Sequence, residues 1–82
     1  MILLTPAAIA ERLIVSVSMV QKLIRAAEYA AEIKAGTRIR DDVPPGLVRY
    51  LDSGFPAPKV IGRAVKRIRG DEFEQWVRNE HL

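Results

Sequence analysis

The chain has 82 residues, enough for one domain with a single small core. Its composition, 49% apolar and 28% charged, excludes a disordered chain, and the absence of cysteine excludes disulfides and thiolate metal sites. The net charge of +3 is compatible with a polyanionic partner, although where the charge lies matters more than its sum.

A first helix is predicted from about residue 6 to residue 12 or 13. The Thr5 hydroxyl can accept a hydrogen bond from an early backbone N–H group, and Pro6 suits the first helical position, where no N–H is required. Ile9 and Leu13 lie four residues apart and give this helix one apolar face. We expect a short break after it, at Ile14-Val15.

A second helix is predicted from a cap at Ser16 to about Ala35, with Gly36 at its C-terminal end. Its apolar residues recur at helical spacing and should pack inward: Val20, Leu23, Ile24 and Ala27. The opposite side of its first turns carries hydrogen-bond donors, two of them cationic: Ser18, Gln21, Lys22 and Arg25. Glu28 and Glu32 continue this side with the opposite charge, so we expect contacts with a polyanion only from the first two turns.

Residues 37–46 have the composition of a linker, with charged residues, a proline pair and no sustained period. Residues 46–53 could form one or two helical turns that end at Gly54, with three apolar side chains inward, Leu47, Val48 and Leu51. Pro56 and Pro58 then require an extended chain.

A basic hairpin is predicted over about residues 58–69, with its turn at Gly62. This segment has five basic residues and no acidic one. Val65 and Ile68 are both expected to face inward, yet strand alternation puts residues three apart on opposite faces. We therefore expect either a bulge near residues 66–67 or a strand that ends before Ile68.

A closing helix is predicted over about residues 71–80. Asp71 is a good N-cap, and Glu74 lies three residues later, as in a capping box. The apolar stripe of this helix is Phe73, Trp76 and Val77.

These elements together favour a DNA-binding helix-turn-helix with a basic wing. Polar residues in the first turns of a helix can reach base edges in the major groove, and cations on a hairpin suit phosphates or the minor groove. Each part also has a plainer explanation, namely two packed amphipathic helices and a charged edge strand that resists aggregation. The predicted interface with double-stranded DNA comprises Ser16, Ser18, Gln21, Lys22, Arg25, Arg63, Lys66, Arg67 and Arg69.

Two parts of the chain resemble the AlpA-like and excisionase-type winged-helix family, which is related to the MerR DNA-binding domain. The N-terminal similarity lies in Leu4 to Leu13, Val15-Ser16, Val20 and Leu23-Ile24. The similarity to the wing and closing helix of the family lies in Phe55 to Pro58, Ile61 to Arg63 and Asp71 to Val77. Together these matches cover something over half of the chain.

The resemblance implies a mainly α fold with a small β-hairpin, a winged helix-turn-helix. The single domain over 1–82 would comprise a helix-turn-helix at about 5–35, a linker or insert at about 36–54, a wing at about 58–69 and a closing helix at about 71–80. It implies a small phage or mobile-element protein, an excisionase that binds and bends attachment-site DNA at several sites. Such a protein associates with itself along the DNA, directs an integrase or other recombinase toward excision, and often represses a promoter.

The chain departs from the family pattern at three places. Ile14 stands where the family has a glycine in the tight turn, and Val17 and Met19 stand where polar residues are usual, where they could touch thymine methyl groups. Residues 25–54 intervene before the Phe-Pro segment, which the recognition helix of the family reaches almost directly. The apolar residues of this extension suit either packing against another protein or enlargement of the core.

Several alternatives stay open. Residues 46–53 also resemble the end of a family recognition helix, in which case Arg49 and Tyr50 would be exposed. A transcriptional repressor or the small subunit of a phage terminase would use a similar winged helix. A protein-interaction module that acts through the long second helix is the alternative from a different functional class.

Catalysis, cofactors and bound metals are not expected. The only histidine is His81, beside the C-terminus, and the chain has no glycine-rich phosphate loop and no metal-ligand spacing. No apolar run approaches the ~20 residues of a membrane span, and Met1 to Leu4 lack the basic start of a signal peptide. We therefore expect a cytoplasmic protein without a membrane partner.

Overall fold

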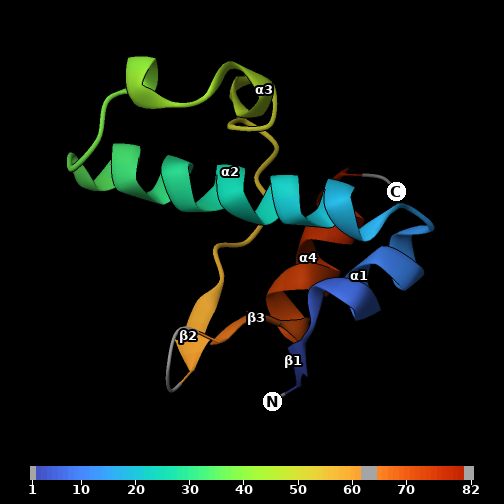
Figure 1. Cartoon of the computed structure of the whole chain (residues 1–82). Coiled ribbons are helices and arrows are strands. Elements are labelled where there is room, and N and C mark those ends of the chain that lie inside the picture. The colour runs from blue at the N-terminus through green and yellow to red at the C-terminus, as the bar shows by residue number, and fades with distance from the viewer. Residues whose placement is uncertain (1, 62–64, 81–82) are drawn as a thin grey trace.

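The computed structural model describes residues 2–61 and 65–80, and it is mainly helical with a small three-stranded antiparallel sheet (Figure 1). The elements in chain order are β1 (Leu3–Leu4), α1 (Pro6–Leu13), α2 (Val17–Ala35), a 3-10 helix (Arg40–Asp42), α3 (Pro45–Val48), β2 (Lys59–Ile61), β3 (Val65–Arg69) and α4 (Gly70–Glu80). In the part of the chain described, no helix combines the length and the apolar character needed to cross a bilayer.

Local capping fixes the ends of α1 and α2 as predicted. The Thr5 hydroxyl accepts a hydrogen bond from the Ala8 N–H at 3.1 Å, and the Ser16 hydroxyl accepts one from the Met19 N–H at 3.1 Å. Gly36 ends α2 in the left-handed conformation, at φ +81°, where glycine is the least strained residue. These three boundaries of the sequence analysis are confirmed.

The turn between α1 and α2 holds an unfavourable residue. Ile14 adopts the left-handed conformation, at φ +58° and ψ +49°, and its side chain is 91% exposed. A β-branched residue in this conformation costs about 1–2 kcal/mol, because its Cβ crowds the following carbonyl oxygen. The tight turn is therefore formed without a glycine, at a cost in stability.

The core lies where α1, α2, β3 and α4 meet. The most completely buried large side chains are Ile9, Val20, Ile68 and Phe73, one from each of these four elements. The predicted inward residues of α2, which are Val20, Leu23, Ile24 and Ala27, are all buried in this core. The amphipathic pattern of α2 therefore predicted its orientation correctly.

Three aromatic side chains hold the end of the insert against α4. The Trp76 ring lies 5.0 Å from that of Phe55 in a T-shaped contact and 6.2 Å from that of Phe73 in a stacked one. The Trp76 indole N–H donates to the Ser53 carbonyl oxygen at 2.8 Å, which satisfies its only polar atom. This arrangement fixes the point where the chain leaves the insert and enters β2.

The segment between α2 and β2 folds back on the second half of α2. In Figure 1, α3 lies along one side of α2, while the β2–β3 hairpin lies on the other. Val43 and Leu51 of this segment are buried, and so is Ala26 of α2. The segment is therefore more ordered than the linker expected for residues 37–46, and helix α3 is only four residues long. The extension enlarges the hydrophobic interior of this chain.

The sheet has the strand order β1-β3-β2, so the predicted hairpin is joined by a strand that the sequence analysis missed. Leu3 and Leu4 pair with Arg69 and Ile68. The hairpin pairs Lys59 with Arg67, Val60 with Lys66 and Ile61 with Val65.

β3 runs without a break to Arg69, so the expected bulge or early strand end is wrong. Ile68 shares its inward face with Lys66 instead, because residues two apart lie on one side of a strand.

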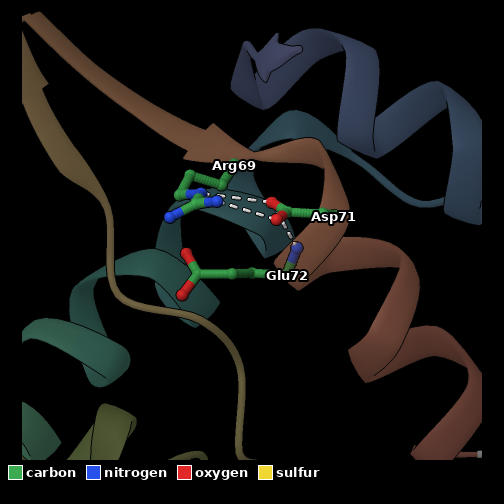
Figure 2. Close-up of polar contacts among 3 residues, drawn as sticks. All are labelled: Arg69, Asp71 and Glu72. Atoms are coloured by element: carbon green, nitrogen blue, oxygen red, sulfur yellow. Dashed lines mark hydrogen bonds and ion pairs between the residues drawn. The ribbon is translucent and has the colours of Figure 1, made fainter. Parts of the chain in front are cut away.

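Helix α4 begins at Gly70, one residue earlier than predicted, and the expected capping box is not formed. The Asp71 carboxylate accepts from the Glu72 N–H at 2.9 Å and from the Arg69 guanidinium at 3.2 and 2.8 Å (Figure 2). Glu74 instead pairs with Arg12 of α1 at 3.3 Å. The hydrogen bonds from Arg69 hold the pKa of Asp71 below its usual value of 3.8. The Asp71 carboxylate therefore binds Arg69 and the Glu72 N–H, and it does not form the predicted capping box with Glu74.

Replacing Ile14 with glycine should stabilise the protein. The substitution relieves left-handed strain of about 1–2 kcal/mol in the folded state. Glycine also has greater backbone freedom in the unfolded state, which offsets about 0.5–1 kcal/mol of this stabilisation. We expect a net increase of roughly 0.5–1 kcal/mol in the free energy of unfolding, measured by urea denaturation. Val15→Gly in the same turn, where φ is not positive, is the control and should destabilise.

Asp71→Asn should remove a pH-dependent contribution to stability. Because the pKa of Asp71 is lowered in the folded state, its contribution is complete above the unfolded value near 3.8 and disappears as the pH falls through the folded pKa. The difference in urea midpoint between wild type and variant should therefore be present at neutral pH and shrink below about pH 4. A difference that is the same at neutral pH and at about pH 2 would contradict this role of the ion pair. Asp41→Asn, at an exposed position, is the control.

Candidate nucleic-acid interface

The first turns of α2 present the predicted polar residues to solvent. All five of these side chains are exposed: Ser16, Ser18, Gln21, Lys22 and Arg25. Ser18, Lys22 and Arg25 follow one another at intervals of four and three residues, which places them on one face of the helix, and Gln21 lies beside them. We call these five residues the α2 stripe. The stripe lies opposite the buried side of α2 that contains Leu23 and Ala27.

The second half of the same face is occupied by internal contacts. The Glu28 carboxylate lies 2.7 Å from the Lys66 ammonium of β3, and the Glu32 carboxylate lies 2.7 Å from the Arg38 Nε. The hydrogen bond to Glu32 raises the pKa of Arg38 above its usual value. Two guanidinium groups lie over the Tyr29 ring, that of Arg25 at 5.3 Å from its centroid and that of Arg38 at 5.0 Å. The acidic half of α2 therefore binds the hairpin and the insert, which leaves the first turns for a ligand.

The outward face of the sheet carries a second group of cations. Lys59 and Arg67 are directly opposite each other on neighbouring strands, so their side chains project from the same face. Arg69 lies two residues after Arg67 and shares that face. Like charges at directly opposed positions destabilise a sheet, unless an anion lies close to them. Lys59 was absent from the predicted site, because only the strand register shows that it lies beside Arg67.

The other predicted hairpin cations differ in their surroundings. Lys66 projects from the inward face of β3 and pairs with Glu28, which directs it toward α2. Arg69 is bound to Asp71 and would have to exchange this carboxylate for a phosphate. The Glu72 side chain extends in the same direction as Arg69 in Figure 2, and its Oε1 is buried with no hydrogen-bond partner within residues 2–61 and 65–80. Arg63 lies outside the described residues.

Residues 46–53 are poorly arranged for the alternative role of a recognition helix. Helix α3 ends at Val48, and a series of turns follows it. Arg49 is exposed, but Tyr50 is half-buried and packs against the core, and Leu51 is buried. The expectation that Arg49 and Tyr50 would both be exposed is therefore wrong for Tyr50.

Apolar side chains surround the turn between α1 and α2. Ile14, Val15 and Val17 are exposed by 91%, 41% and 41%. Next to them is an apolar hollow of about 400 Å³, which is lined by residues that include Met19 and Trp76. Val17 is therefore exposed beside the α2 stripe, while Met19 is half-buried in the wall of this hollow.

Comparison of this chain with protein-family models, with curated proteins and with solved structures finds no match. The functional assignment therefore depends on how the residues of this chain are arranged.

Proposed function

We propose that this protein binds double-stranded DNA in a sequence-specific manner as a winged helix-turn-helix. In this proposal α1 and α2 form the helix-turn-helix, α2 is the recognition helix, and the β2–β3 hairpin is the wing. The observation that carries the proposal is the α2 stripe, which consists only of exposed hydrogen-bonding residues at the capped start of a helix whose other side is buried.

The chemistry of the α2 stripe suits the major groove. Gln21 can bond to an adenine edge, and Arg25 can bond to a guanine edge or a phosphate. Lys22 and the capped first turn, with its free N–H groups, favour contact with the negatively charged backbone. Val17 lies exposed next to the stripe and offers an apolar contact for a thymine methyl group.

The outward cations of the hairpin support a second contact with DNA. Lys59 and Arg67 are like charges at directly opposed positions, and the Arg67 guanidinium donates to the Lys66 carbonyl oxygen at 2.9 Å. A phosphate bound between the two cations would be attracted to both. In this proposal the outward face of the hairpin binds a stretch of DNA backbone next to the groove that α2 enters.

The proposed biological role is that of an excisionase. This role follows from the family resemblance: several copies bind and bend attachment-site DNA, and an integrase is directed toward excision. The protein would supply DNA architecture and no chemical step. A repressor or a terminase small subunit would use the same DNA contacts but would not stimulate excision.

The competing role of a protein-interaction module would use the apolar residues of the second half of α2. Ala26 and Ala27 are buried within the chain, Tyr29, Ala30 and Ile33 are half-buried, and Ala31 is exposed, so less apolar surface is free for a partner than the sequence pattern suggests. The segment with Val43 and Leu51 folds back over the second half of this helix.

Four single substitutions of proposed contact residues should each weaken DNA binding: Lys22→Ala, Arg25→Ala, Lys59→Ala and Arg67→Ala. Each should also lower the slope of log affinity against log salt by about 1, because each removes one phosphate contact. Fluorescence anisotropy with labelled duplex over a range of salt concentrations measures both quantities. Lys34→Ala is the matched control, because it removes one exposed cation from α2 outside the stripe. If the Lys34 variant changes the slope as much as the others, the interface is wrongly placed.

The excisionase role predicts that the purified protein stimulates excision by its cognate integrase on supercoiled DNA carrying the attachment sites. Lys22→Ala/Arg25→Ala should abolish the stimulation, while Lys34→Ala should retain it. DNA selected from random fragments by the protein supplies the target sequence for a bending assay. Specific binding without stimulation would leave the DNA-binding proposal intact and favour the repressor or terminase role.

A further inference from the structure

The ion pair between Glu28 and Lys66 connects two elements that are far apart in the sequence. Glu28 lies in the middle of α2, and Lys66 lies near the start of β3. Their charged atoms are 2.7 Å apart, and the two side chains are only 27% and 38% exposed. This is a short and partly desolvated contact, so solvent screens it less than it screens an ion pair at the surface.

The path of β3 leaves Lys66 little freedom to turn away. Ile68, two residues later on the same face of the strand, is fully buried in the core and fixes which way this face points. Lys66 therefore projects toward α2, and Glu28 meets it at the edge of the face that carries the α2 stripe. In Figure 1 the hairpin lies on the side of α2 opposite α3.

We infer that Glu28 and Lys66 form a strut that sets the position of the hairpin relative to α2, and that Lys66 is a positioning residue and makes no phosphate contact. The inference rests on the proposed function, because the distance between α2 and the hairpin matters to DNA that contacts both. It also changes the role of Lys66 in the predicted interface. Arg67 and Lys59 then carry the phosphate contacts of the hairpin.

The strut and simple electrostatics predict opposite effects for one substitution. Glu28→Gln removes a negative charge close to the α2 stripe, so charge alone would tighten DNA binding. If Glu28 holds the hairpin through Lys66, the same variant should instead weaken specific binding, by roughly three- to tenfold, because the hairpin is no longer held in register with α2.

The experiment measures DNA affinity and salt dependence for five proteins: wild type, Glu28→Gln, Lys66→Glu, the exchanged pair Glu28→Lys/Lys66→Glu, and Glu32→Gln. The last variant is the matched control, because Glu32 lies one turn further along α2 and its partner, Arg38, belongs to the insert. We expect weakened binding for the first two variants. The exchanged pair should recover most of the affinity with the salt slope of the wild type, and the control should bind at least as tightly as the wild type.

Two results would overturn the strut. One is tighter or unchanged binding by Glu28→Gln. The other is failure of the exchanged pair to recover affinity, together with a salt slope lowered by about 1, which is the expectation if Lys66 contacts a phosphate.

Amide hydrogen exchange tests the strut without DNA, so that its failure is distinguishable from failure of the proposed function. Glu28→Gln should accelerate exchange at the hydrogen-bonded amides of β2 and β3 by roughly three- to tenfold, and Glu32→Gln should not. If the wild type binds no DNA, the proposed function fails, and exchange alone then decides whether the strut exists. Equal exchange in both variants would exclude it.

Discussion

The contact of Phe55, Phe73 and Trp76 is the interaction on which the rest of the structure depends. It joins the end of the insert to α4, and the hydrogen bond from Trp76 to the Ser53 carbonyl oxygen fixes the orientation of this junction. β2 leaves the junction in one defined direction, because two prolines keep residues 56–58 extended. β2 then pairs with β3, and β3 leads directly into α4. The hairpin and the closing helix are therefore held by one aromatic cluster within the same small core.

Helix α2 combines two roles along a single exposed face. Its first turns are polar and cationic and make few contacts within the chain, whereas Glu28 and Glu32 further along bind Lys66 and Arg38. The charge of the exposed side chains changes from positive to negative along the helix. This change separates the surface proposed to bind a ligand from the surface that contacts the hairpin and the insert. Because both surfaces belong to one helix, the hairpin and the insert have a fixed position relative to the residues proposed to bind DNA.

Sequence predicted the local features well and the distant ones poorly. The caps at Thr5 and Ser16 and the buried side of α2 depend on residues within one or two turns, so their patterns are visible in the sequence. β1 has only two residues, and its partner lies at the other end of the chain, so no local pattern marks it. The same holds for the candidate site: the α2 stripe was predicted, whereas Lys59 and the pairing of Lys66 required the strand register. The capping prediction at Asp71 failed because α4 begins at Gly70, so Asp71 lies inside the helix, and its carboxylate binds Arg69.

The pairing of β1 with β3 has a consequence for the order in which the protein is completed during synthesis. Leu3 pairs with Arg69, 66 positions later, so β1 has no partner strand until β3 has been synthesised. α1 and α2 can form early from local contacts, but Ile68 and Phe73, which close the core beneath them, are synthesised later. A chain interrupted before residue 68 would expose the apolar side of α2. The α2 stripe would therefore lie on a stable support only after β3 and α4 have been synthesised.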